Sequence, residues 1–357
     1  MQNGISVYLG LDNTFEENMD LIHTAASYGI QRVFTSFHIP ETNLTTFKSQ
    51  AGSLFNAAKS KNMEIITDVS PKMLTLLGME KFSLSAMQFL GVTTIRLDDG
   101  YSIEEIARFS RNPQKIKIQL NASTITSKML MELMQQNANF SNMEALHNFY
   151  PREGTGLAEE TLVRKTSLLH KAGIRTGAFV PSHYRRRSPL KEGLPTLEMH
   201  RNCDFSLAVR HLCAIGMDSI FIGDSLPSTE EMQLLSAAPE DIVTMKLKLS
   251  TQNDRIREIL TRTFTARIDE ARDAIRTQES RQCFQGMIVE PENTKVRSYG
   301  AVTVDNKDYL RYMGELQIIK RPQPADKRVN VVGNLLPEED FLIHYIIPGR
   351  EFRFECI

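Results

Sequence analysis

Residues 17–29 read ENMDLIHTAASYG, and this stretch shows the unit from which most of the chain is built. Its small and apolar side chains recur at the spacing of one helical face, at Met19, Ile22, Ala25 and Ala26. Gly29 then supplies the left-handed residue that ends many helices. A short apolar segment, a polar turn and such a helix repeat along the chain, which predicts successive β–α units.

Eight candidate strands belong to these units and begin near Ile5, Arg32, Met63, Val92, Ile116, Met143, Ile174 and Ser219. Spacings of this length allow each strand to return parallel to the previous one. We therefore predict an α/β fold in which residues 1–239 form a catalytic (β/α)8 TIM barrel. A doubly wound open sheet is the alternative, although the turn Tyr8-Leu9-Gly10-Leu11-Asp12 lacks the glycine pattern of a dinucleotide-binding loop.

The pattern changes after about Pro239, where short alternating runs separated by turn residues replace the helical units. These candidate strands cover residues 243–250, 286–290, 301–304, 315–320, 329–332 and 341–347. Residues 255–279 are rich in arginine and acidic side chains and fit either a helix or a pair of strands. We predict a second, smaller and mostly β domain over residues 240–357.

The composition excludes several classes of protein. The chain has 357 residues, of which 41% are hydrophobic and 24% charged, and its formal net charge of −1 provides no general attraction for nucleic acid or an anionic membrane. No run approaches the roughly 20 apolar residues of a membrane span, and no secretory signal is evident. The four cysteines lack close pairing, as expected of reduced thiols. We expect a cytoplasmic protein without nucleic-acid or membrane partners.

Polar side chains stand at nearly every C-terminal strand end, which is where a TIM barrel places its catalytic groups. They are Tyr8, the segment 35–38, Asp68, Arg96 with Asp98, Asn121 with Ser123, Asn148 with Tyr150, Ser182 with His183, and Asp224. Residues two apart on a strand share a face, so Arg96 and Asp98 are expected to point the same way. The histidines at positions 38, 147 and 183 lie in separate loops. We therefore predict hydrogen bonding for them, with no metal site and no other cofactor.

These strand ends resemble the 6-phospho-N-acetylmuramidase family, and the resemblance extends over essentially the whole chain. The motifs that carry it are Gly4-Ile5-Ser6-Val7-Tyr8, Arg96-Leu97-Asp98, Leu120-Asn121-Ala122-Ser123, His147-Asn148-Phe149-Tyr150-Pro151, Thr155-Gly156-Leu157, Ser182-His183, Thr196-Leu197-Glu198, His200-Arg201 and Tyr312-Met313-Gly314-Glu315-Leu316-Gln317-Ile318. The resemblance implies a TIM barrel followed by a cyclophilin-like β-barrel domain. It also implies a cytoplasmic glycosidase that splits N-acetylmuramic acid 6-phosphate from N-acetylglucosamine during peptidoglycan recycling.

Glycoside hydrolysis requires a protonated carboxyl group and a second group that attacks or stabilises the anomeric carbon. Asp98, Asp68 and Glu198 are the catalytic candidates. Asp98 comes first because Arg96 on the same face would keep its carboxylate ionised, and Glu198 becomes the acid if closure of its loop removes water. An ion pair or a helix cap is the structural alternative for each. A 2-acetamido group on the substrate can also supply the nucleophile, with Asp98 orienting it.

A 6-phosphate needs a local cationic pocket, which in barrels often lies after strands seven and eight. Arg185, in the run Arg185-Arg186-Arg187-Ser188, and the segment 223–225 have this position. Arg152 and Arg297, the latter in the second domain, compete for the role. The other predicted substrate-binding residues, for a phosphorylated amino-sugar disaccharide, are Tyr8, Arg96, Asn121, His147, Asn148, Tyr150 and His183.

Two other classes of function stay open. One is a metal-free lyase, aldolase or isomerase that acts on a phosphosugar, which usually needs a Schiff-base lysine at a strand end. Lys72 and Lys117 are the nearest candidates. The other is a non-catalytic sensor that binds a sugar phosphate on the barrel and a partner on the β domain.

Overall fold

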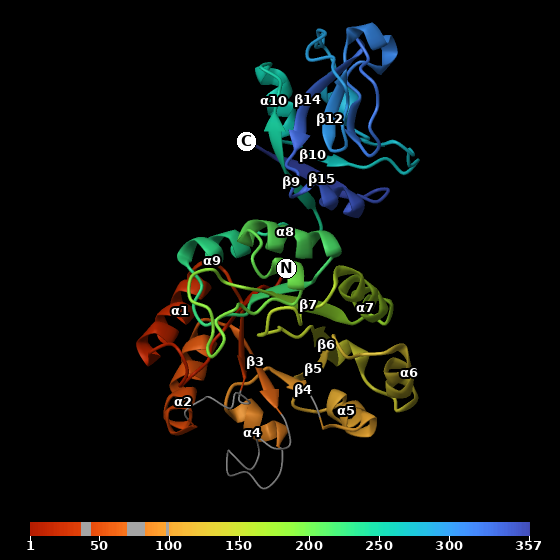
Figure 1. The fold of residues 1–357 in the computed structure, drawn as a ribbon. Coiled ribbons are helices and arrows are strands. Elements are labelled where there is room, and N and C mark those ends of the chain that lie inside the picture. Colours follow the sequence, from red (N-terminus) through yellow and green to blue (C-terminus); the bar gives the residue numbers. More distant parts are fainter. Residues whose placement is uncertain (37–43, 70–82, 98–99) are drawn as a thin grey trace. The chain divides into compact units, whose positions relative to one another are not determined.

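The computed structural model describes residues 1–36, 44–69, 83–97 and 100–357, and the side chains of residues 44–49 are not described. The chain divides into two compact units (Figure 1). The first comprises Met1–Leu212 and Met217–Ala238, and the second comprises Cys213–Gly216 and Pro239–Ile357. Three residues named above, His38, Lys72 and Asp98, lie outside the described residues. No helix in the described ranges has the length and apolar character needed to cross a bilayer.

The first unit is a closed barrel of eight parallel strands in chain order, so the predicted TIM barrel is confirmed. The strands are β1 (Gly4–Ser6), β2 (Arg32–Ser36), β3 (Glu64–Val69), β4 (Thr94–Leu97), β5 (Lys117–Asn121), β6 (Met143–Leu146), β7 (Arg175–Val180) and β8 (Ser219–Ile222). The helices between and after them are α1 (Phe15–Ser27), α2 (Leu44–Ser60), α4 (Leu84–Phe89), α5 (Ile103–Ser110), α6 (Ser127–Gln135), α7 (Glu159–Lys171), α8 (Phe205–Ile215) and α9 (Thr229–Ser236). Closure of the sheet excludes the open-sheet alternative.

Local sequence explains where the helices begin and end. Thr14 caps α1 by accepting a hydrogen bond from the backbone of Glu17, whose side chain accepts one from the backbone of Thr14. Gly29 follows α1 with a φ of 76°, the left-handed conformation that glycine adopts without a steric penalty. The same reciprocal cap begins α5 at Ser102 and α9 at Ser228.

The barrel interior has a charged layer at one end and an aromatic layer at the other. Arg32 at the start of β2 forms ion pairs with Glu64 and Glu144 at the N-terminal end of the barrel. The opposite, C-terminal end is called the mouth below. Near the mouth, the buried cluster comprises Tyr8, Phe34, Ile66, Leu146, Phe179, Leu194 and Phe221. These side chains support the loops that follow the strands.

The second unit contains a seven-stranded sheet with the order β10-β15-β9-β14-β12-β13-β11. The strands are β9 (Val243–Leu249), β10 (Thr263–Thr265), β11 (Ala274–Arg276), β12 (Ala301–Asp305), β13 (Leu316–Ile319), β14 (Val329–Leu335) and β15 (Glu351–Cys356). Two short helices, α10 (Asp254–Leu260) and α11 (Ser280–Cys283), accompany the sheet. A mostly β second unit is thus confirmed, whereas its likeness to cyclophilin stays a prediction.

Two predicted strands of this unit are wrong. Residues 286–290 have no regular structure, and most of residues 341–347 form the 3-10 helix Asp340–Tyr345. The apolar run at 341–347 has no clear period, so it fits a helix as well as a strand. Its consecutive residues Leu342 and Ile343 are both buried, as a helical turn against the sheet allows. Residues 255–279 divide between α10, β10 and β11, so both interpretations hold for part of that stretch.

Candidate active site at the mouth of the barrel

Three of the predicted site residues meet inside the mouth. The register of β3 and β4 places Asp68 beside Arg96, and Arg96 Nη1 donates to Asp68 Oδ1 over 2.9 Å. Arg96 Nη2 donates to the Asn148 side chain, which follows β6. The Arg96 side chain is 4% exposed, so this ion pair is largely shielded from water. The guanidinium therefore fixes a carboxylate and an amide at one position of the mouth.

A cavity of about 320 Å³ adjoins this group and reaches the size range of small-ligand sites. Asn121 and Asn148 line it, as do Leu97, Gly100 and Tyr101. Burial raises the pKa of the Tyr101 phenol to about 12, so this hydroxyl stays protonated near neutral pH. Tyr101 was not among the predicted site residues, because it follows β4 by several residues and lies outside the two-residue alternation.

His147 does not reach this cavity. Its side chain is fully buried, with Nδ1 3.3 Å from Ser123 Oγ and Nε2 3.3 Å from Thr166 Oγ1 of α7. Burial lowers the pKa of the His147 imidazole to about 3, so the ring is neutral. The predicted substrate-binding role of His147 does not fit these contacts, because both ring nitrogens are within hydrogen-bonding distance of protein hydroxyls behind the strand.

Tyr8 also has its hydroxyl occupied. The Tyr8 phenol is 1% exposed and donates to the carbonyl oxygen of Gly223 over 2.7 Å. Burial raises the pKa of Tyr8 to about 12. The hydroxyl thus joins the ends of β1 and β8, while the ring forms part of the wall of the mouth.

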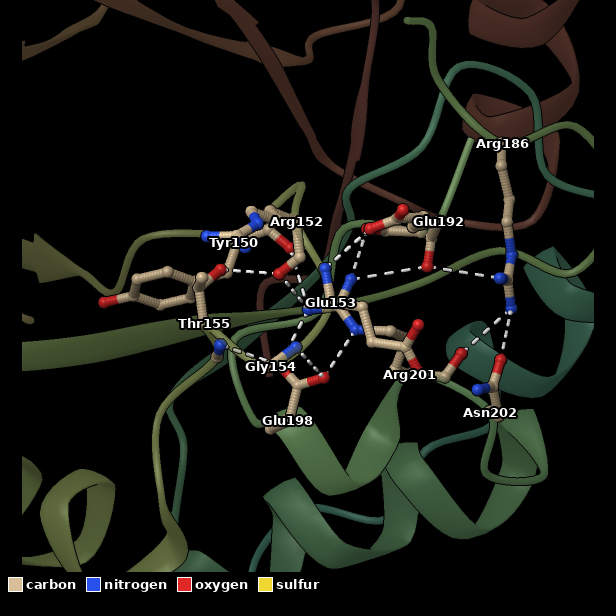
Figure 2. A network of polar contacts seen from close by, with 12 residues as sticks. Tyr150, Arg152, Glu153, Gly154, Thr155, Arg186, Glu192, Glu198, Arg201 and Asn202 are labelled. Carbon is tan, nitrogen blue, oxygen red and sulfur yellow. Dashed lines mark hydrogen bonds and ion pairs between the residues drawn. The ribbon is translucent and has the colours of Figure 1, made fainter. Parts of the chain in front are cut away.

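Glu198 is held in a network of contacts between two loops, which Figure 2 shows. Its carboxylate accepts hydrogen bonds from Arg201 Nε at 2.7 Å and Nη2 at 2.8 Å. The backbone amides of Gly154 and Gly156 donate to the same carboxylate. The Arg201 side-chain bonds, with the two amides, lower the pKa of Glu198 to about 2. The predicted role of general acid does not fit, because a general acid must hold a proton at working pH.

The close approach of the two loops depends on a glycine. A Cβ atom on Gly156 would lie 2.6 Å from Glu198 Oε2 and 2.7 Å from the Glu198 backbone nitrogen. Arg201 completes the junction by donating to the carbonyl oxygens of Tyr150 and Arg152. In Figure 2 the ring of Tyr150 points away from this network, so its phenol is not used in it. Glu198 therefore has a structural role: its carboxylate joins two loops at the rim of the mouth.

His183 and the arginine run follow β7. His183 Nε2 lies 2.9 Å from the carbonyl oxygen of Cys203 and therefore donates to it. Arg185 forms an ion pair with Glu17 at 2.8 Å, and Arg186 donates to the carbonyl oxygens of Glu192 and Arg201. The predicted phosphate-binding role of Arg185 does not fit its contacts, because Glu17 already compensates its charge.

The other predicted cations have different positions. Arg297 belongs to the second unit, where its guanidinium donates to the carbonyl oxygen of Pro324. Lys117 pairs with Glu64 at the N-terminal end of the barrel, away from the position that a Schiff-base lysine needs. In the described ranges, no three His, Cys, Asp or Glu side chains gather closely enough to hold a metal ion.

Comparisons with known proteins identify the family. The model of the 6-phospho-N-acetylmuramidase N-terminal domain matches residues 3–237, and the model of its C-terminal domain matches residues 243–355. The chain belongs to the 6-phospho-N-acetylmuramidase family. This name denotes a glycosidase that acts on a phosphorylated sugar. A search of curated proteins gave no significant match.

Two solved structures are similar to this chain over its whole length. An uncharacterized B. cereus protein is 31% identical, with coverage of 100% of this chain and 99% of the other and a TM-score of 0.87. A conserved Enterococcus faecalis protein of unknown function is 33% identical, with coverage of 100% and 96% and a TM-score of 0.69. The two-unit architecture is therefore shared by these proteins.

Proposed function

We propose that this chain hydrolyses the glycosidic bond between N-acetylmuramic acid 6-phosphate and N-acetylglucosamine, in the cytoplasm and as a step of peptidoglycan recycling. The observation that carries the proposal is the shielded pair of Asp68 and Arg96 beside a sugar-sized cavity, in a chain of this family. A positioned carboxylate is the group that a glycosidase needs next to the anomeric carbon.

Asp68 is proposed as the ionised member of the catalytic pair. Its ion pair with Arg96 favours the charged form. In that form it stabilises positive charge that develops at the anomeric carbon, or orients a 2-acetamido group that attacks this carbon. Asp98, two residues after Arg96, is the second proposed carboxyl group. Asn121 and Asn148 supply amides to the cavity for sugar hydroxyl groups.

The test is to incubate the purified chain with the 6-phosphorylated disaccharide and to measure release of N-acetylglucosamine. The disaccharide without phosphate is the matched control, and we expect it to be a poor substrate. Mass spectrometry distinguishes the other classes, because a lyase would release a product lighter by one water. Saturable binding without any release would show a sensor and contradict the proposal.

A further inference from the structure

Arg187 has a buried guanidinium for which the described residues provide no ion-pair partner. Its side chain is 9% exposed, and its Nε has no hydrogen-bond partner. Arginines are almost never buried this far unless they are paired. Removing an ion from water is costly unless a partner of opposite charge compensates it. The position of Arg187 thus needs an explanation that packing alone does not supply.

Two aromatic rings surround the guanidinium. Arg187 Cζ lies over the Tyr8 ring at 5.0 Å from its centroid and over the Phe149 ring at 4.9 Å. Such contacts stabilise a desolvated cation, but they bring no opposite charge to it. Stacking also uses the faces of the guanidinium, whereas its N–H donors point outward in the plane. The rings therefore hold the cation without replacing an anion.

The backbone of Arg187 is held by carboxylates that form no ion pair with its guanidinium. The Arg187 amide donates to Asp224 Oδ1 over 2.9 Å, and the Ser182 amide donates to Asp224 Oδ2 over 2.9 Å. The next amide, that of Ser188, donates to Asp12 Oδ2 over 2.9 Å. The turn is thus anchored on both sides of Arg187. A preorganised cation of this kind binds an anion without ordering a loop.

The two neighbouring arginines differ from Arg187, because their guanidinium groups have acceptors within the protein. Arg185 has Glu17, and Arg186 has several carbonyl oxygens. Both are also more exposed than Arg187. Arg187 is therefore the arginine of this run that is buried and that finds neither a carboxylate nor a carbonyl acceptor for its guanidinium in the described part of the chain.

We infer that Arg187 is an anion-binding residue of the mouth, which takes a phosphate or carboxylate group of a sugar ligand. A planar guanidinium matches both groups through paired hydrogen bonds. N-acetylmuramic acid 6-phosphate carries both groups, so the identity of the sugar rests on the proposed function. Binding of the anion itself does not depend on that function.

The first experiment separates an anion site from a structural role. Thermal melting is measured for wild type, Arg187→Met and the matched control Arg185→Met, with and without inorganic phosphate. Without phosphate, we expect Arg187→Met to melt at the wild-type temperature or above it, because the change removes an unpaired buried charge. Phosphate is expected to raise the melting temperature of wild type and Arg185→Met only. A lower melting temperature for Arg187→Met, or no response of wild type to phosphate, overturns the inference.

The second experiment identifies the group that is bound. Titration calorimetry compares N-acetylglucosamine 6-phosphate with N-acetylmuramic acid, which carries only the carboxylate. We expect Arg187→Met to weaken binding of one of them about 10- to 100-fold, the usual effect of a charge-assisted hydrogen bond. Weaker binding of N-acetylglucosamine 6-phosphate identifies a phosphate site. Weaker binding of N-acetylmuramic acid identifies a carboxylate site. Arg187→Lys, which keeps the charge without the planar fork, should show an intermediate loss.

The outcomes for Arg187 and for the proposed function are distinguishable. If Arg187→Met hydrolyses the phosphorylated disaccharide with the wild-type kcat/KM and binds both sugars normally, the inference fails and the proposed function stands. If wild type binds phosphate through Arg187 but releases no N-acetylglucosamine, the proposed function fails and the inference stands.

Discussion

Buried arginines at the two ends of the barrel have different surroundings. At the N-terminal end, Arg32 has two carboxylates, those of Glu64 and Glu144, and its Cζ lies over the Phe221 ring at 5.5 Å. At the mouth, Arg187 has aromatic rings but no carboxylate among the described residues. The Arg32 guanidinium thus has carboxylate partners within the chain, whereas we propose that the anionic partner of Arg187 comes from a ligand. The comparison teaches that burial alone does not define the role of an arginine, because Arg96 at the mouth is buried and paired with Asp68, whereas Arg187 is buried against aromatic rings.

The largest effect is expected at the N-terminal end. Glu144→Ala leaves Arg32 with Glu64 alone and removes the acceptor of the Gln119 side chain. Loss of one partner of a buried ion pair costs about 3–5 kcal/mol of unfolding free energy. Urea denaturation measures this loss, and kcat per folded molecule should not change. If Glu144→Ala kept its stability but lost activity, the N-terminal end would be the catalytic end, which would contradict the assignment.

The next largest effect is expected at the mouth. It concerns the catalytic rate and not the stability of the fold. Asp68→Asn keeps the size and the hydrogen-bonding capacity of the side chain but removes its charge. We expect kcat to fall about 10²- to 10³-fold, as for loss of one electrostatic group of an active site. Initial rates on the phosphorylated disaccharide measure the fall. Wild-type rates for Asp68→Asn would remove Asp68 from the mechanism, and a melting curve checks that the variant is folded.

A smaller effect is expected where two loops meet at the rim. Glu198→Gln weakens the bonds from Arg201 and from two backbone amides. We expect a loss of about 2 kcal/mol of unfolding free energy, in the range for hydrogen bonds to charged groups. Urea denaturation near pH 7 measures it. If Glu198 were instead the general acid, Glu198→Gln would abolish turnover at unchanged stability.

The stability difference between wild type and Glu198→Gln should depend on pH, which gives an independent check of the role of Glu198. The pKa of Glu198 is lowered in the folded chain from 4.5 to about 2 by its bonds to Arg201 and the loop amides. The unfolded state therefore binds more protons in this window, so the carboxylate stabilises the fold above pH 4.5. The stabilisation declines as pH falls from 4.5 towards 2. The difference between wild type and Glu198→Gln should shrink over the same window, and a constant difference would contradict the assignment.

The smallest effect is expected for a surface pair, which sets the scale for the others. Arg255 and Glu258 of α10 form an ion pair at 2.9 Å with both side chains more than half exposed. Such pairs contribute about 0.5 kcal/mol or less, because water and salt screen them. Glu258→Gln should therefore leave the urea midpoint almost unchanged. A loss comparable to that of Glu144→Ala would show that burial is not what distinguishes these ion pairs.

The sequence predicted the barrel because its evidence is local and repeated. Helix faces, caps and glycine stops recur in each unit, and the predicted starts of β2, β6 and β8 match those of the structure. The second unit was harder because its strands pair over long distances. The alternation of Phe352 and Phe354 in β15 was visible in the sequence, yet without its neighbour β9 it was not recognised as a strand.

The candidate site was predicted only in part, because local patterns show which residues lie at strand ends but not which of them pair. Arg96 and Asn148 were expected at the mouth because they lie at the C-terminal ends of predicted strands, which depends only on position along the chain. Which charges pair depends on strand register and loop packing, so the bond from Arg96 to Asp68 could not be read from the sequence. Nor could the sequence show that Glu198 contacts Arg201, or that Arg185 is the arginine of the run that pairs with a carboxylate.

Asp224 has a consequence for the order in which the protein matures. Its carboxylate, fully buried just after β8, receives the amides of Ser182, Arg187 and Leu194 from a segment that is synthesised earlier. These three hydrogen bonds cannot form before Asp224 is in place. A nascent chain therefore lacks this anchor of the loop until its eighth strand has left the ribosome.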